Sequence, residues 1–175
     1  MSKLLYGDRL DTFIEEEIPK LIKEDLKSHQ LFTEMDMHAV VFFHLRRALG
    51  ERVDWFVRCN LEMAGVKPDI CAFNRYAPKF VIEAKFVILP AQAYFPKSKL
   101  EEDRLKLRNI RKKYPQLGKG YLIAVFDADR AYDYSLKRDE EWEKHFYREI
   151  FINVQDFRNY ENWKRNWCTI KSNQM

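Results

Sequence analysis

The alternation of apolar and polar positions is clearest between residues 79 and 88, where it has the period of a β-strand. Phe80, Ile82, Ala84 and Phe86 point to one face, and Val81, Glu83, Lys85 and Val87 point to the other. A shorter apolar run at 70–73 precedes this strand. The polar segment 74–78 between the two runs contains proline and is typical of a hairpin connection. We therefore expect two neighbouring antiparallel strands.

The preceding segments predict a helix and a further strand. Residues 33–49 have a Thr33 cap with Asp36 three positions on, and Gly50 follows as a C-terminal stop. Residues 52–63 alternate as a half-buried strand does, and 64–67 turn the chain towards the next strand. Three consecutive strands joined by short turns predict an antiparallel meander.

The rest of the chain is expected to supply helices and one more strand. Ser98 and Glu101 form a capping box that opens a helix over 98–114, which Pro115 ends. Residues 120–126 are continuously apolar, which favours a central strand parallel to its neighbour, since a helix precedes it. We also expect a helical opening over 11–29, broken or bent at Pro19, and two C-terminal helices over about 137–150 and 154–168.

These elements predict a single α/β (α+β) domain over residues 1–175. Its core, at about 33–127, has the order helix, three-strand meander, helix, strand, with a mixed central sheet flanked by helices. Residues 1–32 and 128–175 are expected to be helical elaborations. A chain of this length can bury a substantial core without disulfides.

Charged residues interrupt the apolar strand at one place. Glu83 and Lys85 share a face of a segment apolar enough for a sheet interior, where an unpaired charge costs several kcal/mol. Asp69, at the start of the neighbouring strand, could approach both of them. Two converging carboxylates bind a hard divalent cation well, and an adjacent lysine can hold a water or a phosphate oxygen. The alternative is an exposed Glu–Lys ion pair on a surface hairpin, which contributes little to stability.

Pro68-Asp69 followed by Glu83-Ala84-Lys85 resembles the PD-(D/E)XK signature of restriction endonucleases, Holliday-junction resolvases and repair nucleases. The resemblance implies a restriction-endonuclease-like core and a hydrolase that cuts phosphodiester bonds with Mg²⁺ or Mn²⁺. It implies that Asp69, Glu83 and the Ala84 backbone carbonyl hold the metal, and that Lys85 orients the attacking water or stabilises the pentavalent state. The most favoured activity is that of an endodeoxyribonuclease.

A fourth candidate for the site is Glu34, near the start of the helix at 33–49. It lies on the same stripe as Met37, His38 and Val41, which faces the core. In the nuclease superfamily a helix before the sheet often contributes a further acid to the catalytic metal site, and Glu34 matches that place. Alternatively, Glu34 is an ordinary acid at a helix N-terminus, where the helix dipole favours it. Glu62 is a reserve candidate for the third acid of the site. His38 and His44 are six residues apart and do not share a face, so a zinc pair is not expected.

The second predicted helix is rich in basic residues. Lys99, Asp103 and Lys106 lie along one stripe of it, which resembles the polar edge that this helix presents to the site in related nucleases. Its stretch from Arg104 to Lys113 holds six of them and no acid, which favours contact with the phosphates of a nucleic acid, expected to be DNA. The candidate contacts are Lys99, Arg104, Lys106, Arg108, Arg111, Lys112 and Lys113. The alternative is a solvated basic face that maintains solubility.

Composition limits the kinds of partner and cellular location expected for the protein. The net charge of +4 is compatible with a polyanionic partner without demanding one, and no apolar run is long enough for a membrane helix. Cys59, Cys71 and Cys168 lack CxxC spacing, which favours reduced thiols and a cytoplasmic protein. Aromatic residues of the predicted C-terminal helices favour core packing or a homodimer surface. Two other functions stay open: a catalytically inactive member of the same fold that binds nucleic acid or assembles with proteins, and an interaction domain built on the C-terminal helices.

Overall fold

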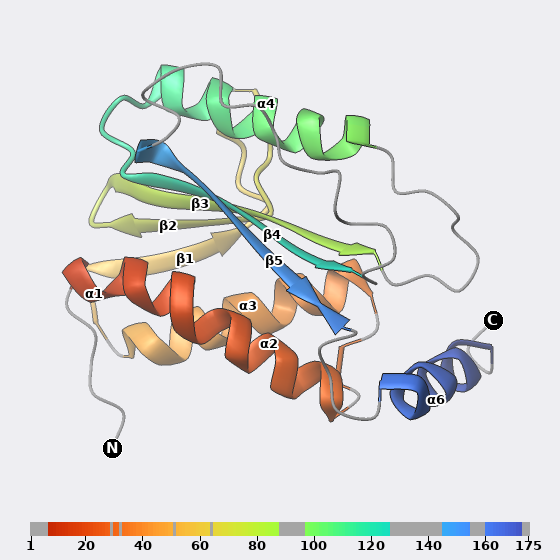
Figure 1. Ribbon diagram of the computed structural model, residues 1–175. Helices are drawn as coiled ribbons and strands as arrows, with labels where there is room; N and C mark the ends of the chain where they lie inside the picture. Colours follow the sequence, from red (N-terminus) through yellow and green to blue (C-terminus); the bar gives the residue numbers. More distant parts are fainter. Residues whose placement is uncertain are drawn as a thin grey trace.

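The computed structural model describes residues 7–28, 30–31, 33–50, 52–63, 65–87, 97–126, 145–154 and 160–172. The elements in chain order are α1 (Gly7–Thr12), the π-helix η1 (Phe13–Glu17), α2 (Ile18–Lys27), α3 (Glu34–Leu49), β1 (Trp55–Cys59), β2 (Ile70–Asn74), β3 (Ala77–Val87), α4 (Lys97–Lys113), β4 (Lys119–Phe126), β5 (Tyr147–Asn153) and α6 (Tyr160–Ser172). They form three layers, with α4 on one face of the sheet and α1, η1, α2 and α3 on the other (Figure 1).

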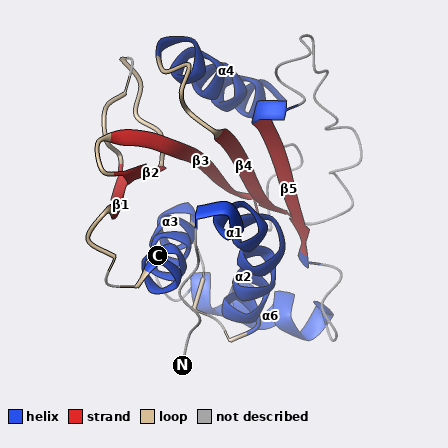
Figure 2. Cartoon of the chain, turned by 90° about the vertical axis from the view of Figure 1, so that its left-hand side faces the viewer, coloured by secondary structure: helices blue, strands red, loops and turns tan. Residues whose placement is uncertain are grey.

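The sheet has five strands in the order β1-β2-β3-β4-β5. The first three strands are antiparallel, whereas β4 runs parallel to β3 and β5 runs parallel to β4. The chain is therefore an α/β protein with a mixed sheet flanked by helices, and the predicted order of helix, meander, helix and strand is confirmed. Viewed from the side, the sheet separates α4 from the other helical layer (Figure 2).

Local sequence signals set the ends of several elements. Asp36 N–H donates to Thr33 Oγ1 at 3.1 Å, and Thr33 N–H donates to Asp36 Oδ2 at 2.8 Å, so the predicted capping box opens α3. The helix ends at Gly50, whose φ of 62° suits glycine. The hairpin between β2 and β3 turns at Arg75 and Tyr76 alone, so Pro78 lies inside β3 and the predicted 74–78 connection is too long.

β1 is shorter than the strand predicted over 52–63. The alternation of apolar residues continues at both ends, but Val53 is 101% exposed and Leu61 is 39% exposed. Only the middle of the segment pairs with β2, from Trp55 opposite Asn74 to Cys59 opposite Ile70. Alternation alone overestimates a strand where no neighbouring strand continues to accept its hydrogen bonds.

The core lies on both faces of the sheet. Ile82 and Ala84 of β3 pack towards α1, α2 and α3, whereas Val81 packs with Leu107 of α4 on the other face. The N-terminal helices bury a continuous stripe at helical spacing, made of Leu10, Ile14, Ile18, Ile22 and Leu26. These helices are therefore an integral layer of the protein rather than an addition to it.

The N-terminal helical run is continuous from Gly7 to Lys27. α1, η1 and α2 follow one another directly, and Pro19 lies at the start of α2, where its missing N–H is tolerated. The predicted helical opening is confirmed, and the helical run is not broken at Pro19.

The prediction of two C-terminal helices is wrong in part. Residues 147–150, placed at the end of a helix over 137–150, instead belong to β5 (Tyr147–Asn153), which pairs with β4 along its length. The free edge of β4 offers backbone partners that a local pattern cannot reveal, and Tyr147 and Ile152 are buried there. Residues 127–144 lie outside the described residues. The second predicted helix, over 154–168, corresponds to α6, which begins only at Tyr160.

Trp163 attaches α6 to the rest of the structure. Its side chain is buried in the main core, and Nε1–H donates to the backbone carbonyl of Leu26 at 2.7 Å. This fits the expected core role of the C-terminal aromatics. In the described part of the chain, no helix has the length and hydrophobicity needed to cross a membrane.

The N-terminal layer can be tested at Ile22, which is fully buried. Ile22→Ala should lower the free energy of unfolding by about 2–5 kcal/mol, because it removes buried methyl groups and leaves a cavity. Glu24→Ala, at an exposed position of the same helix, should change it by only about 0.5 kcal/mol. Urea denaturation measures both. Equal small effects in the two variants would show that this helix is not part of the cooperative core.

Candidate functional site

The structure brings Asp69 and Glu83 together beside the central strand β3, where β2 begins. Ile70 of β2 lies opposite Ile82 of β3, so one further step in the antiparallel register sets Asp69 opposite Glu83. The Ala84 N–H then donates to Asp69 Oδ2 at 2.7 Å. The two carboxylates proposed from the sequence therefore lie side by side.

Glu83 is the most constrained charged group of this site. Its side chain is 0% exposed, and Oε2 accepts a hydrogen bond from Lys106 Nζ at 2.6 Å. The other oxygen, Oε1, has no hydrogen-bond partner among the described residues. Burial and the nearby Asp69 charge raise the pKa of Glu83 to about 8, although Lys106 opposes the shift. A second cation near Oε1 would satisfy this carboxylate.

Asp69 has a different electrostatic environment. Burial alone would raise the pKa of its carboxyl, but hydrogen bonds from His38 and from the Ala84 N–H outweigh burial and lower that pKa. His38 Nε2 lies 3.3 Å from Asp69 Oδ2 and 3.4 Å from the Ala84 carbonyl oxygen. Asp69 is therefore the ionised member of the pair at neutral pH.

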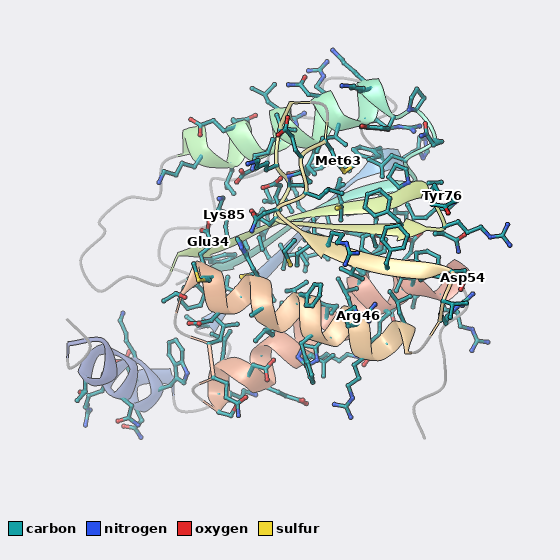
Figure 3. The ribbon with its side chains drawn as sticks, turned by 180° about the vertical axis from the view of Figure 1, so that it is seen from behind. Glu34, Arg46, Asp54, Met63, Tyr76 and Lys85 are labelled. Atoms are coloured by element: carbon teal, nitrogen blue, oxygen red, sulfur yellow. The ribbon has the colours of Figure 1, made fainter. Side chains whose placement is uncertain are left out.

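Lys85 connects the two helical layers. Its Nζ lies 3.2 Å from Glu34 Oε1 of α3 and 3.3 Å from Asp103 Oδ2 of α4. Burial would lower the pKa of Lys85, but Asp103 and Glu34 more than compensate and raise it. Figure 3 shows Glu34 and Lys85 next to each other at one end of the sheet. Glu34 thus reaches the site through Lys85.

Three residues of the site received no catalytic role from the sequence, although the nuclease resemblance places Asp103 and Lys106 on the helix edge that faces the site. Asp103, only 4% exposed, lies between Lys85 and Lys106, with its Oδ1 3.4 Å from Lys106 Nζ. Lys106 was assigned to nucleic-acid contact, and the structure places its ammonium on Glu83. His38 was considered only as a zinc ligand with His44. Helical spacing gave a signal for each, since His38 follows Glu34 by four residues and Lys106 follows Asp103 by three.

The other predicted phosphate contacts on α4 divide into two groups. Arg104 is only 7% exposed and lies 3.6 Å from Glu101, and Arg111 donates to the Leu117 carbonyl at 2.8 Å. These two arginines are built into the fold. The solvent-facing group consists of the exposed Lys99, Lys112 and Lys113, whereas Arg108 is half-buried and its Nε is shielded from solvent.

The donor atoms fit a hard divalent cation. Asp69, Glu83 and the Ala84 carbonyl offer oxygen atoms, and Glu83 Oε1 is a buried polar atom that lacks a partner within the described ranges. Within those same ranges, no group of three His, Cys, Asp or Glu side chains is already arranged to hold a metal ion. Lys106, Lys85 and His38 contact the acids in this structure, so an ion would have to displace or share these contacts.

A cavity of about 370 Å³ lies away from these residues. It is lined by Leu10, Asp11, Trp55, Asn74, Lys79, Phe80 and Gly118. Asp54 and Tyr76, which neighbour this region in sequence, lie at the end of the sheet opposite to Glu34 and Lys85 (Figure 3). None of the candidate site residues lines the cavity.

No protein-family model matches the sequence, and neither a curated protein nor a solved structure matches it significantly. The likeness of Pro68-Asp69 and Glu83-Ala84-Lys85 to the nuclease signature stays a prediction. The geometry of the site is the basis on which a function can be proposed.

The raised pKa of Glu83 predicts how stability depends on pH in metal-free protein. Its folded pKa, about 8, lies above the ordinary value of 4.5, so its protonation stabilises the fold below pH 4.5 and this contribution is lost as pH rises through 8. Glu83→Gln should therefore melt at a higher temperature than the wild type at pH 8–9 in EDTA, with a smaller difference at pH 5.

Thermal melting of both proteins across this range is the measurement. Glu17→Gln is the matched control, because Glu17 forms a surface pair with Lys20 at 2.7 Å. Parallel melting profiles for wild type and Glu83→Gln would show that Glu83 does not titrate as the buried site requires.

Proposed function

We propose that this protein is a metal-dependent nuclease that hydrolyses phosphodiester bonds, most favourably an endodeoxyribonuclease with a restriction-endonuclease-like core. The observation that supports it is the meeting of Asp69, Glu83 and Lys85 at one end of the sheet, with a buried Glu83 oxygen that lacks a partner in the described structure. Carboxylates with strongly shifted pKa values are concentrated at the functional sites of proteins.

The cation, Mg²⁺ or Mn²⁺, would be held by Asp69, Glu83 and the Ala84 carbonyl, with Glu34 completing its surroundings. These are oxygen donors of the type that such ions prefer. When bound, such an ion supplies a water of lowered pKa and positive charge beside the scissile phosphate. Asp69 is ready for this role because its pKa is lowered, whereas Glu83 must lose its proton first.

Lys85 stabilises charge rather than accepting a proton. Its raised pKa keeps the ammonium protonated at neutral pH, and Glu34 and Asp103 hold it from two sides. A fixed ammonium can donate to a phosphate oxygen or to the attacking water as negative charge develops. Lys106 Nζ contacts Glu83 Oε2 at 2.6 Å, and a bound ion would have to share or displace this contact.

The surface that guides DNA to the site is proposed to be the exposed side of α4. Lys99, Lys112 and Lys113 are exposed there, while Asp103 and Lys106 of the same helix belong to the site. A basic stripe beside the catalytic groups can hold the phosphate backbone without reading the bases.

A second candidate function is a non-catalytic member of the same fold that binds nucleic acid or assembles with proteins. It is favoured by the Lys106 ammonium on Glu83, which leaves no ready three-ligand metal group in the described residues. The two candidates differ in whether a divalent ion binds at Asp69 and Glu83.

Plasmid nicking with Mg²⁺ or Mn²⁺ tests the activity. Glu83→Gln and Lys85→Ala should each lower the rate by about 100-fold or more, the usual effect of removing a group that stabilises the transition state. Glu17→Gln and Lys20→Ala are matched controls from an exposed pair and should cut like wild type. A panel of duplex, single-stranded, flap and four-way-junction DNA, with RNA counterparts, defines the substrate. Nicking that persists in both site variants would identify another site or a contaminant.

Metal binding can be tested separately by thermal melting. An ion at 100 times its Kd should stabilise the folded protein by about 2.7 kcal/mol, because it binds the native state alone. Asp69→Asn should lose most of the shift, whereas Asp54→Asn, at a surface pair with Arg52, should keep it. A folded wild-type protein with no shift in either Mg²⁺ or Mn²⁺ would contradict the proposed metal site.

A further inference from the structure

The cavity of about 370 Å³ lies near the end of the sheet that carries Asp54 and Tyr76, opposite to the proposed catalytic end (Figure 3). This volume is near the lower end of the range for small-molecule sites, about 300–1,000 Å³. A molecule of one or two rings therefore suits it. The lining residues come from α1, β1, β2, β3 and the turn before β4, and they are Leu10, Asp11, Trp55, Asn74, Lys79, Phe80 and Gly118.

Three buried apolar side chains contribute to the wall of this cavity. Leu10, Trp55 and Phe80 all belong to the core cluster between the sheet and the N-terminal helices. Two of the three are aromatic, and aromatic rings pack well against the flat faces of other rings. The wall therefore favours a ligand whose body is apolar and planar.

The indole N–H of Trp55 is a buried donor without an acceptor. Its Nε1 is shielded from solvent and has no hydrogen-bond partner in the described part of the chain. Asn74, opposite Trp55 in the strand register, directs its amide Nδ2 to Asp54 Oδ2 at 3.3 Å. A buried donor that lacks an acceptor costs free energy. Because the indole lines the cavity, a small rotation of its ring would bring the N–H to an acceptor seated there.

The charges around the cavity favour an anion. Asp11 is already paired, since its Oδ1 accepts from the Tyr121 hydroxyl at 3.0 Å and its Oδ2 lies 3.1 Å from Lys119 Nζ. Lys79, the exposed cation of the lining, forms no ion pair with another described residue. The charge that remains uncompensated beside the cavity is therefore positive.

We propose that this cavity is a second binding site, which takes a small aromatic carboxylate. The ring of the ligand packs against Trp55 and Phe80, and its carboxylate accepts the Trp55 Nε1–H and balances the charge of Lys79. A carboxylate serves both unmet groups, an amide offers an acceptor without the charge, and an amine offers neither. The site is separate from Asp69, Glu83 and Lys85, so it does not depend on the proposed nuclease activity.

Titration of the full-length protein with three probes of one ring system tests the proposal. The probes are naphthylacetate, naphthylacetamide and naphthylethylamine, which carry an anion, a neutral acceptor and a cation. Fluorotryptophan labelling gives a fluorine resonance for each of the four tryptophans, and the resonance that Trp55→Phe lacks belongs to Trp55. Naphthylacetate should move this resonance and bind about 2–5-fold more tightly than the amide, as an exposed charge pair allows. The amine should not bind.

Two variants separate the roles of the donor and of the charge, with calorimetry as the measurement. Trp55→Phe keeps an aromatic ring but removes the N–H, and it should weaken naphthylacetate binding by about 10–100-fold, the effect of losing a hydrogen bond to a charged acceptor. Lys79→Ala, at an exposed position, should make the acid and the amide bind equally. Lys20→Ala is the matched control, because it removes an exposed lysine that does not line the cavity.

The proposal is overturned if the wild type binds no naphthylacetate, if the three probes bind alike, or if the Trp55 resonance does not move. Should Trp55→Phe fail to fold, the probe series on wild type and Lys79→Ala still decides, with the resonance that moves assigned from the remaining tryptophan variants. Glu83→Gln should bind naphthylacetate like wild type. Loss of binding in that variant would place the ligand at the catalytic end of the sheet and would also overturn the proposal, whereas failure of the cavity leaves the proposed nuclease site unaffected.

Discussion

The burial of one carboxylate, Glu83 in the middle of β3, is the constraint on which the site depends. A charge without access to solvent costs several kcal/mol unless it is paired, and Asp69 beside it adds repulsion. Two features reduce this cost. Lys106 Nζ of α4 lies 2.6 Å from the Glu83 carboxylate, and the raised pKa of Glu83 keeps it largely protonated. Keeping Asp69 and Glu83 close together therefore lowers the stability of the folded protein.

Charged side chains from both helical layers reach this part of β3. α3 contributes Glu34 and His38 from one side of the sheet, and α4 contributes Asp103 and Lys106 from the other. Lys85 of β3 contacts Glu34 and Asp103, and so joins the two layers through a single ammonium. The helices lie on opposite faces of the sheet (Figure 2). This arrangement allows acidic and basic side chains from both layers to alternate around β3.

Much of the architecture could be predicted from the sequence because its signals are local. The capping box at Thr33 and the alternation through β3 each act over a few residues, and the structure has the corresponding helix and strand. The nearness of Asp69 to Glu83 could be expected as well, since a tight hairpin between β2 and β3 sets their register. Residues that meet through adjacent strands are within reach of sequence reasoning.

By itself, then, the sequence determined the meander, the two flanking helices, the central strand and the acidic pair within them. Only the tertiary structure decided that residues 147–153 form β5, because the partner of that strand is the edge of β4, far away in the chain. It also decided which cations of α4 face inwards: Lys106 meets Glu83, while Lys112 and Lys113 face solvent. The physical reason is the same in both cases, since hydrogen bonds and charge pairs between distant segments leave no periodic trace in either segment alone.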